Sequence, residues 1–203
     1  MLFEKPIALF SEDYAVFYPE VSKALKEMNI PFKFLKAKDI EEGNLQFFSV
    51  LIIPGGYTFK LLNLLSEKAV NEIRFFIKGG GGYIGICMGA YAASAFNLCK
   101  TKALRFYGEK MVEIEIVNPL HPVAKGYKDK ILMWYQNGPE MVLKQNEEAI
   151  GIFQSGRAAI LSTNLEEGKI VLFSTHPEKT KETWRMLKNA IEFCSNPTMN
   201  FQL

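Results

Sequence analysis

The sequence predicts an α/β protein with a mostly parallel central sheet and an additional antiparallel portion at one edge. Strand and helix patterns alternate through the first half of the chain, which implies right-handed crossovers between parallel strands. Residues 49–53, Ser-Val-Leu-Ile-Ile, form the strongest predicted strand. A continuous apolar run of this kind is typical of a strand that is covered on both faces. The chain has 203 residues, so we expect a single domain over residues 1–203.

The first half of the chain alternates short apolar segments with segments of helical periodicity. Residues 67–78 are predicted to form a helix whose inner side carries Val70, Ile73, Phe76 and Ile77. Residues 39–44 are expected to form a loop or one short helical turn. The predicted strands are 7–10, 32–35, 49–53 and 83–86, and the predicted helices are 19–28, 67–78 and 88–96.

The second half is richer in strands, which we expect to form the antiparallel or mixed portion of the sheet. Residues 108–117 have the alternation of a strand, and turn residues at 118–123 and 136–139 separate the strands that follow. The C-terminal tail, residues 195–203, is expected to be loose or to dock through Phe201. The predicted strands are 108–117, 131–135, 149–153, 158–163 and 170–174, and the last helix is 181–194.

Composition argues against several classes of function. The chain has 24 Lys and Arg against 22 Asp and Glu, without a basic run, so neither nucleic acid nor an anionic membrane is expected as a partner. It has no apolar stretch of about 18 residues to span a bilayer, and its first residues lack the order of a signal peptide. The three cysteines follow no paired spacing, so we expect a soluble protein in a reducing compartment, the cytoplasm.

One cofactor motif is considered and rejected. Gly80, Gly82 and Gly85 have the G-x-G-x-x-G spacing of a dinucleotide site. That motif follows a strand and opens a helix, whereas these glycines follow a predicted helix and open a strand. We therefore expect no cofactor and no metal.

A cysteine turn is the stretch around which the chain is organised. Cys87 lies between Gly85 and Gly89, after a predicted strand and before a predicted helix. This is the cysteine form of the strand–nucleophile–helix turn, in which the nucleophile has a strained conformation. Side chains in place of the glycines would strike the neighbouring strand or helix. Most free cysteines are small buried apolar residues, but the free N–H groups of the following helix favour a thiolate at Cys87.

A thiol nucleophile requires a base and a group that orients the base. The chain has two histidines. His176 follows an apolar strand, and Glu178 two residues later can hold its tautomer, so we expect His176 to be the base. His121 lies between prolines in a turn, with no carboxylate close to it in sequence, so we expect it to be mainly structural.

Backbone N–H groups are expected to form an oxyanion hole, as acyl transfer requires. The N–H of Met88, one residue after Cys87, is one candidate donor. Gly56, which follows the strongest predicted strand in the segment Pro54-Gly55-Gly56, is the other. A plain turn is the alternative interpretation of this glycine pair.

These motifs together resemble the class I glutamine amidotransferase superfamily. Within it, the chain is most similar to the N-terminal, amidotransferase-like domain of some biotin–protein ligases, and the resemblance extends over nearly the whole chain. The segments that carry it are Ile53-Pro54-Gly55-Gly56, residues 80–91 around Cys87, Tyr135-Gln136-Asn137-Gly138-Pro139 and His176-Pro177-Glu178.

The resemblance implies a flavodoxin-like three-layer sandwich and release of ammonia from glutamine through a γ-glutamyl thioester. It implies Cys87 as nucleophile, His176 as base and Glu178 as the orienting acid, with a small amide as substrate and an unidentified synthase or ligase as partner. Ligands bind beyond the carboxyl ends of the strands in such sheets. The residues expected to line the substrate site there are Gly55, Tyr57, Tyr91, Tyr135 and Asn137.

Two functions remain open from the sequence. The first is a cysteine-dependent amidohydrolase or amidotransferase-like enzyme. The second is a non-catalytic binding or regulatory module, because the glutamine that usually stands four residues after the nucleophile is Tyr91 here. Core packing is likewise an alternative to substrate binding for Tyr83, Tyr91 and Tyr135. Thiol proteases of related fold usually carry histidine directly after the cysteine, where this chain has Met88.

Overall fold

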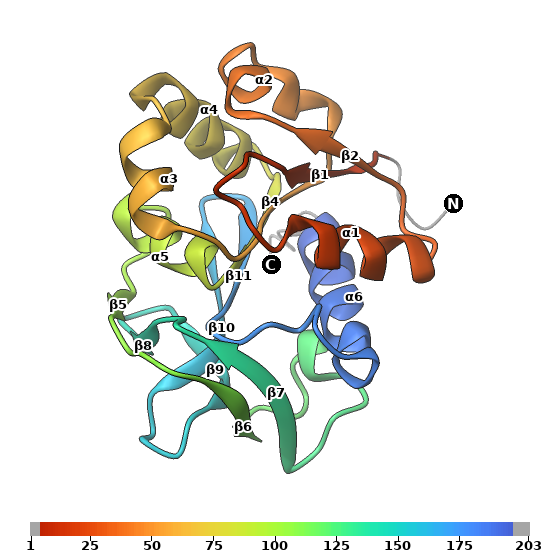
Figure 1. Cartoon of the computed structure of the whole chain (residues 1–203), viewed down its shortest axis with the longest axis vertical. Helices are drawn as coiled ribbons and strands as arrows, with labels where there is room; N and C mark the ends of the chain where they lie inside the picture. Colours follow the sequence, from red (N-terminus) through yellow and green to blue (C-terminus); the bar gives the residue numbers. More distant parts are fainter. Residues whose placement is uncertain (1–4, 197–203) are drawn as a thin grey trace, which may run out of the picture.

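The core of the molecule is one sheet whose first half is parallel (Figure 1). The computed structural model describes residues 5–196. Strand order in the parallel half is β2-β1-β3-β4-β11, and each neighbouring pair is parallel. These strands are β1 (Ile7–Phe10), β2 (Phe32–Leu35), β3 (Val50–Ile53), β4 (Gly82–Ile86) and β11 (Gly168–Phe173).

The sheet continues beyond β11 with antiparallel strands, as the sequence predicts. Strand β10 pairs antiparallel with β11, and β9, β6 and β7 follow in that order, while β8 and β5 lie off this path. These strands are β5 (Lys102–Leu104), β6 (Glu109–Ile116), β7 (Lys130–Gln136), β8 (Glu140–Val142), β9 (Glu148–Ile152) and β10 (Ala158–Leu165).

Helices cover both faces of the parallel half and make three layers. One buried cluster contains residues of α1, α6 and the short turn η2, and the other contains residues of α2, α3, α4, α5 and η1. The helices are α1 (Tyr18–Glu27), α2 (Ala37–Glu41), α3 (Thr58–Leu64), α4 (Glu67–Lys78), α5 (Met88–Ala95) and α6 (Lys181–Ser195), and the 3-10 turns are η1 (Asn44–Phe47) and η2 (Pro122–Ala124).

The continuous apolar strands are buried on both sides. In β3, Val50 and Ile52 belong to one cluster while Leu51 and Ile53 belong to the other, and all four are fully buried. Successive side chains of a strand point to opposite faces, so a sheet with helices on each face requires an apolar residue at every position. The strand predicted from this run is therefore confirmed.

Several short elements differ from the prediction. Helix α3 and the three-residue strands β5 and β8 were not expected, and α2 begins at Ala37 rather than near Asp39. Helix α6 ends at Ser195, and Phe201 of the predicted tail lies outside the described residues. Within residues 5–196, no helix is long and apolar enough to cross a membrane.

Candidate active site

Cys87 lies in the sharp turn between β4 and α5, with φ 50° and ψ −98°. A positive φ is strained for a residue with a side chain, and this backbone conformation is typical of an exposed nucleophile at the end of a buried strand. A Cβ on Gly85 would lie 2.5 Å from Gly89 O, and a Cβ on Gly89 would lie 2.1 Å from Ile53 O. Both glycines are therefore required for the turn to pack against its neighbours.

Two hydrogen bonds hold this turn against the buried core of the protein. The buried hydroxyl of Tyr83 donates to Gly89 O at 2.8 Å. The N–H of Cys87 donates to Phe173 O, the last residue of the neighbouring strand β11, at 2.8 Å. Tyr83 thus belongs to the core beneath the turn and not to a ligand pocket.

His176 and Glu178 form a fully buried pair after β11. His176 Nδ1 lies 2.7 Å from Glu178 Oε1, and both side chains have no exposed surface. The N–H of His176 donates to Trp134 O of β7 at 2.8 Å. Among the described residues, His176 Nε2 and Glu178 Oε2 have no hydrogen-bond partner. The ring is therefore oriented through Nδ1, and Nε2 is left available.

The charge of Glu178 controls the protonation of His176. Burial alone would lower the pKa of His176, but the Glu178 carboxylate outweighs burial, and the neighbouring Cys87 adds to its effect, so that the pKa rises to about 10. The imidazolium form is accordingly favoured near neutral pH. This arrangement can supply a proton to a leaving group next to the sulfur.

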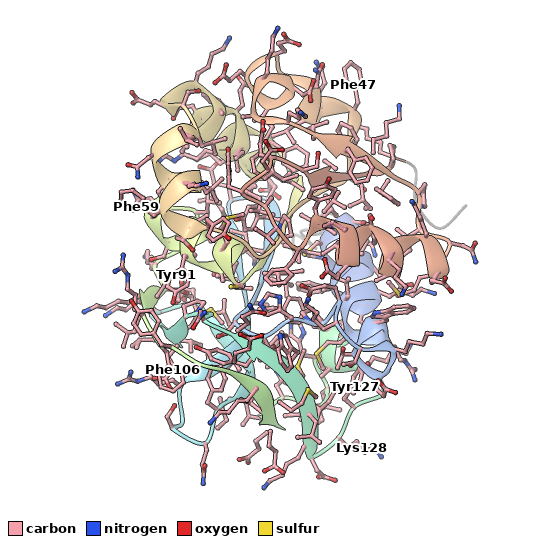
Figure 2. All side chains as sticks on the ribbon, viewed as in Figure 1. Phe47, Phe59, Tyr91, Phe106, Tyr127 and Lys128 are labelled. Carbon is pink, nitrogen blue, oxygen red and sulfur yellow. The ribbon has the colours of Figure 1, made fainter. Side chains whose placement is uncertain are left out.

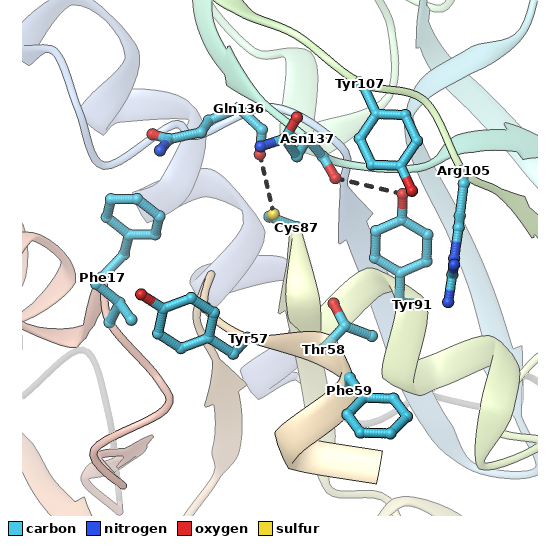
Figure 3. Close-up of a pocket in the computed structure, with 12 residues that line it drawn as sticks. Phe17, Tyr57, Thr58, Phe59, Cys87, Tyr91, Arg105, Tyr107, Gln136 and Asn137 are labelled. Carbon is cyan, nitrogen blue, oxygen red and sulfur yellow. Dashed lines mark hydrogen bonds between the residues drawn. The ribbon is translucent and has the colours of Figure 1, made fainter.

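Cys87 and His176 both lie next to Gly55. A Cβ added to Gly55 would lie 2.6 Å from His176 Cε1 and 3.4 Å from Cys87 Cβ. The cysteine thiol itself donates to the carbonyl oxygen of Gln136 at 3.3 Å (Figure 3). The structure thus brings Cys87, His176 and Glu178 together, with the sulfur held on a backbone carbonyl.

The two candidate oxyanion donors adjoin residues of this group in the chain, Met88 after Cys87 and Gly56 after Gly55. Met88 begins α5, and the first N–H groups of a helix have no intrahelical acceptor. Gly56 is held between two backbone hydrogen bonds, from Phe17 N–H to Gly55 O at 3.1 Å and from Tyr57 N–H to Tyr14 O at 2.9 Å. Within residues 5–196, no carbonyl accepts the N–H of Gly56.

An open cavity of about 370 Å³ reaches the sulfur of Cys87. Figure 2 shows Phe59 and Tyr91 along one side of the molecule, next to the segment that contains Phe106. The predicted residues that line the cavity are Gly56, Tyr57, Cys87, Tyr91 and Asn137. The sequence did not indicate Phe17, Phe59, Arg105, Tyr107 and Gln136, which also line it.

Tyr135 is a correction to the predicted substrate site. Its ring is fully buried in the core, and its hydroxyl lies 2.7 Å from Gly138 O and 2.9 Å from Phe106 O. The side chains of β7 alternate between faces, so the next residue, Gln136, lines the cavity instead. Tyr135 therefore lies behind the residues that line the cavity and is not one of them.

The remaining predicted residues have specific partners. Gly55 lies beneath the cavity, against His176. Asn137 lines the cavity, but its Oδ1 accepts the N–H of Gly108 at 2.9 Å, and its carbonyl accepts the hydroxyl of Tyr91 at 3.3 Å. Asn137 and Tyr91 therefore join α5 to the loop after β5 at the edge of the cavity.

His121 is buried away from this group. Its Nδ1 accepts the N–H of Val123 at 3.2 Å, and its Nε2 lies 3.0 Å from Ser162 Oγ. Burial lowers the pKa of His121, with Glu148 acting in the opposite direction. Because Nδ1 is an acceptor, Nε2 carries the proton and donates to Ser162, so His121 does not activate that serine.

Sequence comparison gives one family match. Residues 40–111 match the family model described as biotin-protein ligase, N terminal. The matched span contains Gly56 and Cys87 and ends before His176. A comparison with curated protein sequences found no match.

Comparison of the structure gives similar architectures. A chain of the PurLQS structure from Thermotoga maritima has a TM-score of 0.77 at 17% identity, covering 93% of this chain and 99% of that one. A protein from Thermoplasma acidophilum, assigned to GMP synthase, has a TM-score of 0.74 at 14% identity, covering 95% of both chains. A glutamine amidotransferase from Thermotoga maritima has a TM-score of 0.66 at 14% identity, covering 93% of this chain and 81% of that one.

These likenesses establish the fold. The chain has the class I glutamine amidotransferase-like fold, a flavodoxin-like three-layer α/β sandwich, as the sequence motifs predicted. The resemblance to the N-terminal region of biotin–protein ligases is confirmed over residues 40–111.

Proposed function

From the amidotransferase-like fold and the buried histidine–glutamate pair behind Cys87, we propose that residues 1–203 form one cysteine-dependent amidohydrolase domain that cleaves small amides. In this proposal Cys87 is the nucleophile, His176 the general acid and base, and Glu178 the group that orients and charges His176. The observation that carries it is the strained Cys87 backbone next to a fully buried, carboxylate-paired imidazole.

The proposed reaction has two steps. The Cys87 thiolate attacks the amide carbonyl carbon, and the tetrahedral intermediate collapses when the carbon–nitrogen bond breaks and the leaving amine takes a proton from His176 Nε2. Water then attacks the thioester carbonyl and gives its proton to His176. The carbon–sulfur bond breaks and releases a carboxylic acid, so one amide and one water yield one acid and one amine.

The backbone N–H groups of Gly56 and Met88 are proposed to bind the oxyanion of both intermediates. Neither N–H group donates a hydrogen bond to a backbone carbonyl of the described residues. Gly55, Tyr57, Tyr91 and Asn137 are proposed to shape the substrate site. A group donating to a developing oxyanion contributes on the order of 10²–10³ in rate.

A synthase or ligase that accepts the released ammonia is the proposed partner. The solved structures with this fold include a protein assigned to GMP synthase. The absence of paired cysteine spacing favours a reducing, cytoplasmic setting for the reaction.

Thiol alkylation tests the proposed nucleophile. At pH 7 we expect iodoacetamide to modify Cys87 at least about tenfold faster than Cys99 or Cys194, because burial raises the pKa of both other thiols. Peptide mass spectrometry resolves the three sites, and Cys87→Ser is the control. Equal rates at the three cysteines would contradict the proposal.

A binding or regulatory module is the second candidate, and one observation favours it. The Cys87 thiol donates to Gln136 O, which holds the proton on sulfur, and Tyr91 occupies the position usually held by glutamine. Mass spectrometry of the intact protein with candidate amides separates the two functions. A thioester on Cys87 with released ammonia supports the enzyme, whereas saturable binding without adduct or product supports the module.

A further inference from the structure

The cavity at Cys87 has a cationic side chain and lacks an anionic one. Arg105, in the loop after β5, lines the cavity. Within residues 5–196, no aspartate or glutamate lines it, and Arg105 forms no ion pair with a described carboxylate. The guanidinium charge is therefore available to a bound molecule.

Two further cations lie against aromatic rings of the cavity wall. Lys60 Nζ is 5.3 Å from the ring centroid of Tyr57, and Lys179 Nζ is 4.1 Å from that of Phe17. Lys179 is neutralised by Glu20 at 2.8 Å, while Lys60 has no carboxylate partner in the part of the chain that the structure describes. The uncompensated charges in and next to the cavity, Arg105 and Lys60, therefore favour an anion.

The ring of Tyr91 separates Arg105 from the Cys87 sulfur within the cavity (Figure 3). Figure 3 shows Arg105 on the side of the Tyr91 ring that faces away from Cys87. Burial raises the pKa of Tyr91 to about 12, and Arg105 acts on it in the opposite direction, which agrees with a guanidinium close to this ring. A molecule that meets both Cys87 and Arg105 must therefore pass along this ring.

We infer that this site selects carboxamides that carry a carboxylate or similar anion at the end remote from the amide and no free ammonium group. The amide would lie at Cys87, an apolar middle along the ring of Tyr91, and the anion at Arg105. The inference rests on the proposed function, and it specifies which amides that function acts on.

Free glutamine fits this description only in part. Its carboxylate matches Arg105, but its α-ammonium group would arrive beside the same cation. A charged group that leaves water without a partner is strongly disfavoured, and the cavity wall supplies no carboxylate to pair with an ammonium, as far as the described residues extend. An analogue that lacks the ammonium group should therefore be preferred.

Three amides of the same chain length test this selection. Glutaramate carries the carboxylate without the amine, glutamine carries both, and pentanamide carries neither. Ammonia release should give a kcat/KM for glutaramate at least about tenfold above those for glutamine and pentanamide. Arg105→Gln should abolish the glutaramate preference over pentanamide, whereas Lys102→Gln, which removes the same charge from the same segment outside the cavity, should retain it.

Binding to a variant without the thiol separates this inference from the proposed function. Calorimetry with Cys87→Ala should detect glutaramate binding that Arg105→Gln weakens at least about tenfold. If no amide is cleaved but this binding is found, the proposed function fails and the anion site stands. If amides are cleaved with glutamine or pentanamide equal to glutaramate, or if Arg105→Gln leaves the preference intact, the inference is overturned while the proposed function stands.

Discussion

Replacing Glu178 by glutamine should return His176 to the neutral form at physiological pH. The substitution keeps the shape of the side chain and an oxygen that accepts the proton on Nδ1, but removes the negative charge. Glu178 Oε2 has no hydrogen-bond partner among the described residues, so the amide nitrogen that replaces it displaces no existing hydrogen bond. The change therefore isolates the charge of the carboxylate.

The expected effect is large because the pair is fully buried. Burial lowers the pKa of His176, and Glu178 is the main group that reverses this and raises the pKa to about 10. Without that charge, only the smaller effect of Cys87 opposes burial, so we expect the pKa to fall to its ordinary value of 6.5 or below. A fall of this size corresponds to roughly 5 kcal/mol less stabilisation of the imidazolium, at about 1.4 kcal/mol for each pKa unit, and leaves about a quarter or less of the rings protonated at pH 7.

The chain is well suited to a direct measurement. It has two histidines, so a spectrum of the protein labelled with ¹⁵N in the imidazole rings contains two ring systems, which His121→Gln assigns. The midpoint of the His176 titration should move from about 10 in the wild type to 6.5 or below in Glu178→Gln. The rate of Cys87 alkylation at pH 7 should fall in parallel if the imidazolium stabilises the thiolate.

Glu148→Gln is the matched control. Glu148 Oε2 lies 3.9 Å from His121 Nε2, so this substitution should lower the pKa of His121 and leave that of His176 unchanged. A His176 midpoint that stays above about 8 in Glu178→Gln would refute the reasoning. It would mean that Cys87, and not Glu178, keeps the imidazole ring of His176 protonated.

Three further outcomes follow from the geometry. Gly55→Ala places a methyl 2.6 Å from His176 Cε1, so it should reduce amide hydrolysis, measured as ammonia release, at least about 100-fold. The methyl of the control variant Gly79→Ala meets nothing closer than 3.3 Å, so this variant should keep its turnover in the same assay. Tyr83→Phe leaves Gly89 O without its buried donor and should lower the free energy of unfolding by about 1–3 kcal/mol in urea titrations; an unchanged midpoint would show that the bond is not needed. Burial lowers the pKa of His121 in the folded state, so the unfolded chain binds a proton more readily there, and stability should fall as pH drops below 6.5. The urea midpoints of unfolding at pH 7 and pH 5 measure this loss of stability, which His121→Gln should reduce. His176 contributes to stability with the opposite sign, because its pKa is raised in the folded state, and this contribution is lost as pH rises from 6.5 through about 10.

Structure could be predicted from the sequence where a short local pattern is compatible with one backbone conformation. The glycines around Cys87 indicate the tight turn because no other residue fits there, and the run at 50–53 indicates a doubly covered strand. The His176–Glu178 pair is similarly local, since two residues of backbone suffice to bring the ring and the carboxylate together.

The outer wall of the cavity could not be predicted in the same way. On β7, the choice between Tyr135 and Gln136 as the cavity residue depends on which face the strand presents, and this is set by its pairing with β6 and not by local sequence. Helix α3 was missed because its large apolar side chain Phe59 is 76% exposed, which obscures the amphipathic pattern. Arg105 enters the cavity only through a loop whose path depends on contacts with Asn137.

The parallel pairing of β4 with β11 places Ile86 opposite Phe173, so the segments that carry Cys87 and His176 leave the sheet from adjacent strands. Adjacent strands are held about 4.8 Å apart by their backbone hydrogen bonds, whatever side chains they carry. Core substitutions that weaken either buried cluster should therefore change what fraction of the molecules is folded while each folded molecule keeps the same reactive geometry. Specific activity, divided by the folded fraction, should stay constant across such a series.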